Sequence, residues 1–128
     1  MKRHTNRGFT LVEIILVIII IGILAAIIIP KFAGQRDNAK IAATKANLAS
    51  LRSAVRLWQT DHDGTPPGAL SDLVTKYIRA IPEEAITPSS TVKGARDGSG
   101  GWVYDAAEGD VSVNLNDDDV NGQAYADY

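Results

Sequence analysis

The amino-acid sequence predicts an α+β fold, in which one long N-terminal helix packs on a small C-terminal layer built around a β-hairpin. Three observations lead to this prediction. An almost uninterrupted apolar run occupies residues 9–29, and apolar residues then recur at helical spacing up to residue 58. Two short segments rich in β-branched and aromatic residues, 102–104 and 111–115, flank a turn. The 128 residues suffice for one such domain.

The apolar run over residues 9–29 has the length of a membrane-spanning helix. Only Thr10 and Glu13 within it are polar. At 1.5 Å per residue such a helix covers about 32 Å, close to the thickness of the bilayer core. It is longer than the apolar part of a secretory signal peptide, and no small-residue cleavage site follows it. We therefore expect a transmembrane helix that the mature protein keeps.

Residues 30–60 are predicted to continue the same helix in amphipathic form. One apolar stripe, interrupted by a single threonine, follows a spacing of 3, 4, 3, 4 and 3 residues: Ile41, Thr44, Leu48, Leu51, Val55 and Trp58. Pro30 cannot donate a hydrogen bond to the carbonyl of Ala26, so a kink or a loosened turn is expected there. Gly22 lowers helix propensity by about 1 kcal/mol relative to alanine. The Asp- and Pro-rich stretch 61–68 ends the helix.

The small globular region is expected over residues 61–128. Its first element is a short helix at about 70–77, with Ser71 as N-cap. Residues 83–101 are rich in Pro, Ser, Thr and Gly and read as a loop. The hairpin at about 102–115 should cover the helical stripe around Leu51, Val55 and Trp58. From Asn116 onward the chain is polar, and we expect it to be loosely ordered.

Charge is distributed asymmetrically along the chain. Residues 1–8 carry Lys2, Arg3 and Arg7 and no acid, whereas residues 97–128 carry eight acids and no Lys or Arg. By the positive-inside rule the basic start stays in the cytoplasm and the acidic end lies across the membrane. Because phosphate contacts need Lys and Arg, the acidic end argues against nucleic-acid binding.

Few features of the sequence indicate chemistry. There is no cysteine, and hence no disulfide or thiolate metal site. No Gly-rich phosphate loop, zinc spacing or nucleophile elbow is present, so we expect neither catalytic residues nor an enzyme. Asp117, Asp118 and Asp119 are candidates for a calcium site, but adjacent residues rarely point at one ion and the spacing fits no EF-hand. A solvated acidic tail without a cofactor is the favoured interpretation, and Asp61, His62 and Asp63 are expected to form an exposed turn.

Glu13 is the unusual residue of the apolar run. A charged side chain within a bilayer costs about 2.5–3.5 kcal/mol on insertion scales. Glu13 either extends to the nearby interface or pairs with a cation, and no Lys or Arg follows it before Lys31. A free amino group created at Phe9 would supply such a cation.

The segment Arg7-Gly8-Phe9-Thr10-Leu11-Val12-Glu13 resembles the prepilin peptidase site of type IV pilins and type II secretion pseudopilins. Residues 21–27 and the pair Ile29-Pro30 are similar to the N-terminal helix of that family, and the close match covers about residues 7–36. The resemblance implies cleavage after Gly8 by a membrane aspartic protease, loss of the leader 1–8 and N-methylation of Phe9.

The resemblance also implies how subunits assemble. Glu13 would pair with the Phe9 ammonium of a neighbouring subunit and so fix the register, because both charges are costly in lipid. A pair within one subunit is the alternative, since positions four apart share a helix face. Gly22 and Pro30 would lie where the family's helix partly unwinds in filaments.

The implied role is a structural subunit of a type II secretion pseudopilus, and a type IV pilus subunit for adhesion, motility or DNA uptake is the alternative. Ile81-Pro82-Glu83-Glu84 stands where major pseudopilins usually carry an Asp-Pro-Trp-Gly type motif, and type IVa pilins usually have a cysteine pair. A non-polymerising, membrane-anchored periplasmic binding domain is a third interpretation. The implied partners are further copies, related pilin-like subunits, prepilin peptidase, an inner-membrane assembly platform and membrane lipid.

Overall fold

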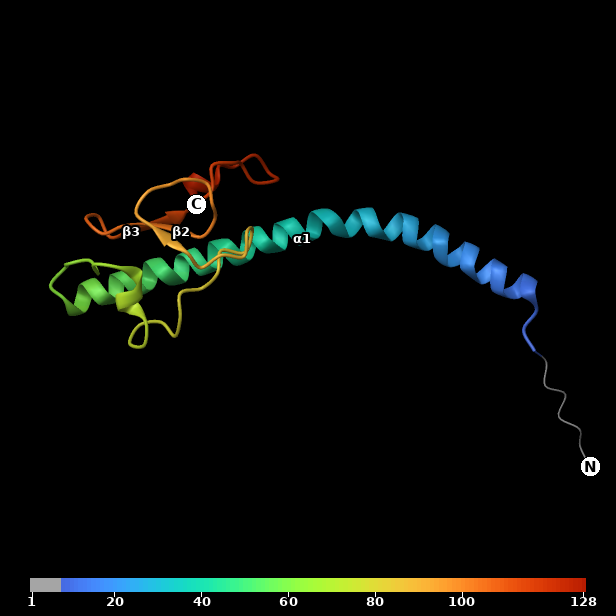
Figure 1. Cartoon of the computed structure of the whole chain (residues 1–128), viewed down its shortest axis with the longest axis horizontal. Coiled ribbons are helices and arrows are strands. Elements are labelled where there is room, and N and C mark those ends of the chain that lie inside the picture. Colours follow the sequence, from blue (N-terminus) through green and yellow to red (C-terminus); the bar gives the residue numbers. More distant parts are fainter. Residues whose placement is uncertain (1–7) are drawn as a thin grey trace, which may run out of the picture. The chain divides into compact units, whose positions relative to one another are not determined.

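The computed structural model describes residues 8–128, except for the side chains of residues 30–33. The predicted leader 1–8 therefore lies, up to Arg7, outside the described residues. The chain divides into two compact units, Met1–Arg36 and Asp37–Tyr128. One long helix and a small three-stranded sheet confirm the predicted α+β class (Figure 1).

Helix α1 (Leu11–Asp61) is the longest element and contributes to both units. In the first unit its side chains up to Ile29 are almost all exposed within the chain. The helix does not end at Pro30, and a kink at that residue stays a prediction. At its other end Gly64, with a φ of 84°, donates its N–H to the carbonyl of Gln59 at 2.8 Å and closes the last turn.

In the second unit α1 buries the stripe that the spacing singled out. Ile41, Thr44, Leu48, Leu51 and Val55 are buried, and Trp58 is half-buried against the same core. The other faces of α1 from residue 37 to 60 are mostly exposed. This part of the helix is therefore one wall of the globular core, as an amphipathic pattern requires.

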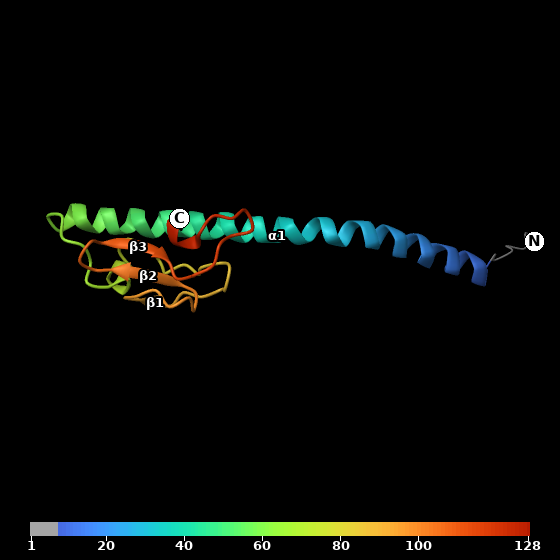
Figure 2. The same ribbon diagram turned by 90° about the horizontal axis from the view of Figure 1, so that it is seen from above.

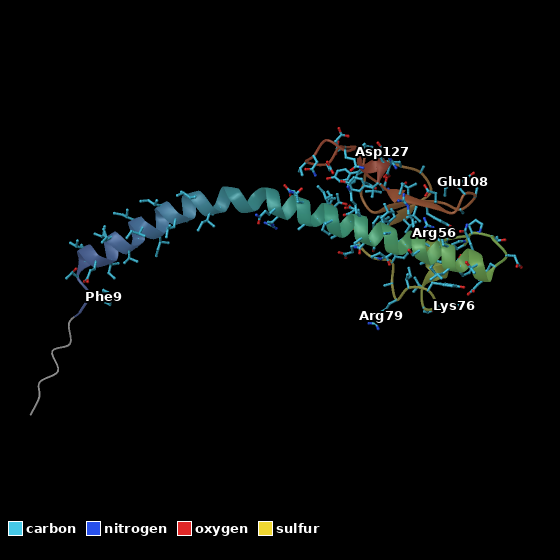
Figure 3. The ribbon with its side chains drawn as sticks, turned by 180° about the vertical axis from the view of Figure 1, so that it is seen from behind. Phe9, Arg56, Lys76, Arg79, Glu108 and Asp127 are labelled. Atoms are coloured by element: carbon cyan, nitrogen blue, oxygen red, sulfur yellow. The ribbon has the colours of Figure 1, made fainter. Side chains whose placement is uncertain are left out.

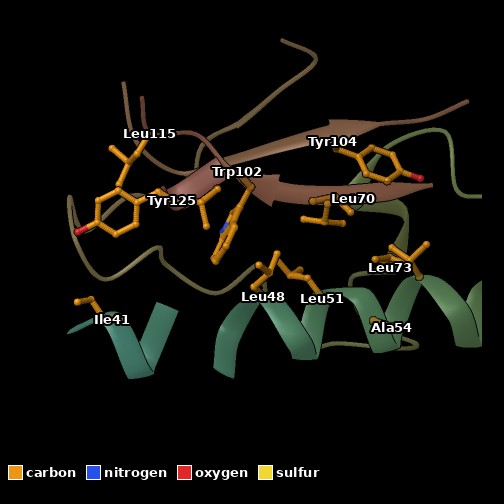
Figure 4. Packing of buried hydrophobic residues seen from close by; sticks show 13 residues of the cluster. Ile41, Leu48, Leu51, Ala54, Leu70, Leu73, Trp102, Tyr104, Leu115 and Tyr125 are labelled. Carbon is orange, nitrogen blue, oxygen red and sulfur yellow. The ribbon is translucent and has the colours of Figure 1, made fainter. Parts of the chain in front are cut away.

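The other wall is a three-stranded sheet in the order β1-β2-β3, formed by β1 (Val92–Lys93), β2 (Trp102–Asp105) and β3 (Asp110–Val113). Strands β2 and β3 form the expected antiparallel hairpin, with Trp102 opposite Val113 and Asp105 opposite Asp110. The sheet lies along the C-terminal half of α1 (Figure 2). Alternate residues of the hairpin point into the core, where Trp102 lies over Leu48 and Leu51 (Figure 4).

Strand β1 falls in the segment 83–101, for which the sequence predicted only a loop. It pairs in parallel with β2, and eight residues connect the two strands. Two glycines with positive φ permit this tight return: a Cβ at Gly100 would lie 2.0 Å from Thr87 Oγ1, and one at Gly101 would lie 2.3 Å from the Thr91 carbonyl oxygen. Because β1 has only two residues, its sequence contains no alternation of apolar and polar residues from which a strand could be predicted.

The helix predicted at about 70–77 is wrong beyond its first turn. A 3₁₀ helix, η1 (Leu70–Leu73), is capped by Ala69 rather than by Ser71, and the Ala69 N–H donates to Asp72 Oδ2 at 2.9 Å. Leu70 and Leu73 are both buried, so a single helical turn is enough to place these two apolar side chains in the core. The chain then becomes extended, and Thr75 has a φ of 83°, which no helix tolerates.

The expectation of a loosely ordered, solvated tail after Asn116 is also wrong. The tail contains a 3₁₀ turn, η2 (Tyr125–Asp127), and Tyr125 is buried in the core. Asp119 is only 6% exposed, and its carboxylate accepts hydrogen bonds from the Asn121 and Gln123 N–H groups at 2.7 and 3.0 Å and from the Tyr128 hydroxyl at 2.5 Å. The hydrogen bonds of Asp119 thus hold the tail in a turn. The composition of the tail does not show that one aspartate has this role.

This cluster gives the tail a defined pH dependence. The hydrogen bond from Tyr128, followed by the Gln123 N–H, lowers the pKa of Asp119 from 3.8 to about 2. Because the folded-state pKa is depressed, the stabilisation is complete above about pH 4 and is lost as the pH falls towards 2. In NMR titrations of the detergent-solubilised full chain, we expect the amide shifts of Asn121 and Gln123 to titrate with a midpoint near 2.

Asp119→Asn is the control for this titration. An amide side chain cannot titrate in this range, so both backbone shifts should stay constant between pH 6 and pH 2 in the variant. A midpoint near the ordinary value of 3.8 in the parent chain would mean that the hydrogen bonds from Tyr128 and Gln123 do not lower the pKa of Asp119.

Candidate processing and assembly segment

The residues at the predicted cleavage site precede the first turn of α1. Gly8, Phe9 and Thr10 have no regular secondary structure, and all three are exposed. Phe9 is 80% exposed and points away from the helix (Figure 3). Apart from its chain neighbours, no described residue has a heavy atom within 4 Å of where a Gly8 Cβ would be. A protease needs such an accessible, non-helical peptide bond, so the geometry suits cleavage between Gly8 and Phe9.

Glu13 forms a capping box with Thr10, which the sequence analysis missed. The Glu13 N–H donates to Thr10 Oγ1 at 3.2 Å, and Glu13 Oε2 accepts from the Thr10 N–H at 3.0 Å and from its hydroxyl at 3.2 Å. The Thr-x-x-Glu spacing immediately before an apolar run is the sequence signal of this motif. Glu13 therefore helps to define where α1 begins.

The capping box gives the charge of Glu13 no counter-ion among the described residues. None of the three salt bridges among the described residues includes it. Its hydrogen-bond donors are a backbone amide and a hydroxyl of Thr10, both neutral, and the positive end of the helix dipole adds a modest attraction. A cation from outside the described chain can still bind the carboxylate, as the docking hypothesis requires.

The surface of α1 behind Glu13 is apolar on every side. From Leu11 to Ile29 its large side chains are between about half and three-quarters exposed within the chain, and they radiate in all directions (Figure 3). This part of α1 is long and apolar enough to cross a membrane, and none of the most apolar stretch is buried within the chain. A helix of this kind has to be covered by lipid or by other protein.

The two remaining candidates for assembly, Gly22 and Pro30, both lie within α1. A Cβ added at Gly22 would meet no described heavy atom within 4 Å beyond its chain neighbours and the local helix backbone, and the side chain of Pro30 lies outside the described residues. The structure brings neither residue together with Glu13, which is nine residues before Gly22 in the same helix. Their roles in filament packing stay predictions.

The three aspartates considered for calcium do not converge. Asp119 is buried and its carboxylate is occupied by the three hydrogen bonds described above, whereas Asp117 and Asp118 are exposed. Across residues 8–128, no group of three His, Cys, Asp or Glu side chains is arranged to hold a metal ion. Calcium binding by these residues therefore gains no support from the geometry.

The turn containing Asp61 and His62 stabilises the end of α1. The Tyr77 hydroxyl donates to Asp61 Oδ2 at 2.7 Å and Lys76 Nζ lies 3.0 Å away, and these contacts, led by the Tyr77 hydrogen bond, hold the pKa of Asp61 below its ordinary value. The His62 ring stacks on Trp58 with 4.0 Å between ring centroids. All of these groups have a structural partner, so the turn requires no ligand.

Glu84 is the buried acid that sequence reasoning overlooked. It is fully buried, and its carboxylate accepts hydrogen bonds from the hydroxyls of Thr44 at 3.2 Å and Thr87 at 2.6 Å, from the Thr87 N–H at 3.0 Å and from the Ile86 N–H. Thr44 in turn accepts the Ala85 N–H at 3.0 Å. Thr44, the single polar residue of the helical stripe, was the available signal in the sequence. A buried threonine needs a hydrogen-bond partner, and Glu84 is that partner.

Comparisons with known proteins agree with these features. The family model described as the prokaryotic N-terminal methylation motif matches residues 3–29. The type II secretion system core protein G of Klebsiella michiganensis is 33% identical over 100 residues, which cover 66% of this chain and 70% of that protein. The corresponding protein of Pseudomonas aeruginosa is 35% identical over 66 residues, covering 52% of this chain and 46% of that protein.

Pilus proteins are similar to the chain as well. The type IV narrow pilus major component of Thermus thermophilus is 38% identical over 85 residues, which cover 66% of this chain and 67% of that protein. No solved structure gives a significant match. The cleavage-site motif, the exposed apolar helix, the small sheet and these similarities agree: the chain belongs to the family of type IV pilin-like proteins, which includes the type II secretion pseudopilins and the type IV pilins.

Proposed function

We propose that the chain is a structural subunit of a type II secretion pseudopilus, cut between Gly8 and Phe9 and polymerised through the first part of α1. The single observation that carries this proposal is the exposed, all-round apolar surface of residues 11–29. Near its N-terminal end lies the carboxylate of Glu13, which has no counter-ion among the described residues. Such a helix is stable in lipid before assembly and against neighbouring helices afterwards.

The proposal specifies topology and partners. The basic residues before Gly8 stay in the cytoplasm and the unit Asp37–Tyr128 lies in the periplasm of a bacterial inner membrane. Prepilin peptidase removes the leader and methylates Phe9, and an inner-membrane platform adds subunits to further copies or to related pilin-like subunits. The role is structural, so no catalytic residue, metal or cofactor takes part in it.

A type IV pilus subunit is the second candidate, and the similarity to the Thermus thermophilus narrow pilus component favours it. A deletion strain separates the two candidates. Loss of secreted proteins with surface filaments intact is expected for a pseudopilus subunit. Loss of surface filaments with secretion intact would instead make the chain a pilin, and a strain unchanged in both respects would contradict both assignments.

The mass of the mature chain tests processing independently. We expect a mature protein that begins at Phe9 and carries one additional methyl group, because residues 3–29 match the methylation motif. Mass spectrometry of the chain purified from membranes measures this directly. A mature chain that keeps residues 1–8 would favour a non-polymerising membrane anchor.

A further inference from the structure

The outer surface of α1 in the globular unit carries a segregated positive charge. Between residues 38 and 60 the helix has four Lys or Arg residues and no acid. Lys45, Arg52 and Arg56 lie at spacings of seven and four residues, which places them on one face of the helix. Asp117 and Asp118, in contrast, are exposed in the C-terminal tail. One copy thus presents a mainly basic helix face and an acidic loop.

The three cations line an open groove between α1 and the C-terminal tail. Leu48, Ala49 and Ser53 contribute small and apolar side chains from the helix, and Gln123, Asp127 and Tyr128 line the groove from the tail. Figure 3 labels two of these lining residues, Arg56 on α1 and Asp127 in the tail. Since the groove contains three cations and one carboxylate, it favours an acidic occupant.

The cations are only partly engaged within their own chain. Lys45 donates to Gln123 Oε1 at 3.0 Å and lies 4.0 Å from the centre of the Tyr128 ring. Arg52 donates to the Val111 carbonyl at 3.0 Å, with Asp110 3.9 Å away. Arg56 also borders a hollow that contains Glu108 and Asp110, yet neither Arg56 nor Lys45 forms a salt bridge with any described residue.

The loop 116–121 carries exposed acidic and apolar side chains that match the basic, partly apolar lining of the groove. Asp117 and Asp118 are exposed, and neither forms a salt bridge within the described chain. Val120 beside them is 59% exposed. The buried Asp119 and the pairing of Asp118 with Ala124 hold the loop in shape, so little conformational freedom is lost on binding.

We propose that this groove receives the loop 116–121 of a second copy, with Asp117 and Asp118 facing Lys45 and Arg56 and with Val120 against Ala49. The tail extends past the strands towards the N-terminal side of the unit, whereas the groove runs from Lys45 to Arg56, about 16 Å along α1 (Figures 1 and 2). A copy displaced along the helix axis can therefore place its loop in the groove of its neighbour.

The contact is heterologous, because groove and loop are different surfaces of one chain. A heterologous contact that does not close into a ring continues as a helical filament, whereas a two-fold contact would stop at a dimer. Exposed ion pairs contribute little to affinity, so the role of this contact is to fix the register of the globular units rather than to supply most of the affinity. The inference rests on the proposed function, in which the chain polymerises.

Disulfide cross-linking tests the contact, because the chain contains no cysteine of its own. Ser53→Cys and Asp118→Cys are introduced together into the full-length chain, and isolated filaments are oxidised and run on a denaturing gel. We expect a ladder of dimers, trimers and higher multimers. In the matched control Ala43→Cys replaces Ser53→Cys; Ala43 is exposed on α1 but does not line the groove, and no ladder is expected.

Charge reversal gives a second readout that requires no cross-link. Arg56→Glu is expected to reduce filament yield several-fold without changing the melting temperature of the globular unit, and Asp118→Arg in the same chain should restore the yield. Filaments of the Ser53→Cys, Asp118→Cys variant that give no ladder on oxidation, or an Arg56→Glu variant with normal yield, would overturn this inference alone. Absence of any filament from the parent chain would overturn the proposed function as well.

Discussion

Replacing Glu84 by alanine is expected to lower the free energy of unfolding of the globular unit by about 3–5 kcal/mol, because the substitution removes a fully buried carboxylate that accepts four hydrogen bonds. The N–H groups of the half-buried Ile86 and of Thr87 would lose their acceptor, and a cavity would remain beside the buried Thr44. Domains of this size are stable by only about 5–15 kcal/mol, so a large share of the stability would be lost. Thermal and urea unfolding followed by circular dichroism and tryptophan fluorescence would measure the change.

Two variants show whether hydrogen bonding is the cause. Glu84→Gln preserves volume and one acceptor oxygen, but its amide nitrogen cannot accept the N–H and the hydroxyl that donate to the other oxygen, so an intermediate loss is expected. Thr44→Val removes one donor and also leaves the Ala85 N–H without its acceptor. Equal stability of the parent, Glu84→Gln and Glu84→Ala chains would contradict the role assigned to this cluster.

Local and periodic patterns explain what the sequence predicted correctly. Spacing within a few residues predicts the long helix, its buried stripe from Ile41 to Val55 and the β2–β3 hairpin. The spacing of apolar residues decides which of them share one face of a helix or strand, and that face is the one that is buried. The cleavage-site motif is also local, since Gly8, Phe9 and Glu13 lie within six residues. For the same reason the Thr10–Glu13 capping box was available in the sequence although it was missed.

Features that depend on distant partners could not be predicted in the same way. Glu84 and Thr44 are 40 residues apart, and nothing near Glu84 in the sequence indicates that it is buried. The parallel pairing of β1 depends on the backbone freedom of Gly100 and Gly101, and the ordered tail depends on the hydrogen bonds of Asp119. The failed helix at 74–77 has a related cause, because burial of Leu70 and Leu73 was complete after one turn.

Replacing Glu13 by leucine is expected to abolish most filament assembly while leaving membrane insertion intact. The substitution removes a charge whose burial in the bilayer costs about 2.5–3.5 kcal/mol, so insertion becomes easier. It also removes the carboxylate available to the ammonium group of a neighbouring Phe9, so subunits lose the interaction that would select the correct register. Membrane fractionation measures insertion, and electron microscopy of sheared filaments measures assembly.

Leucine at position 13 also destroys the capping box, and a second variant is needed to separate the two roles of this side chain. Glu13→Gln keeps an acceptor at the third helical position, where Gln serves in capping boxes as Glu does, but carries no charge. Thr10→Ala has the converse effect, because it removes the hydroxyl that accepts the Glu13 N–H and keeps the carboxylate. If charge pairing between subunits drives docking, Glu13→Gln should assemble as poorly as Glu13→Leu, and Thr10→Ala should assemble nearly as well as the parent. The opposite result, filaments from Glu13→Gln and few from Thr10→Ala, would mean that Glu13 acts by defining where α1 begins, and the docking role would be wrong.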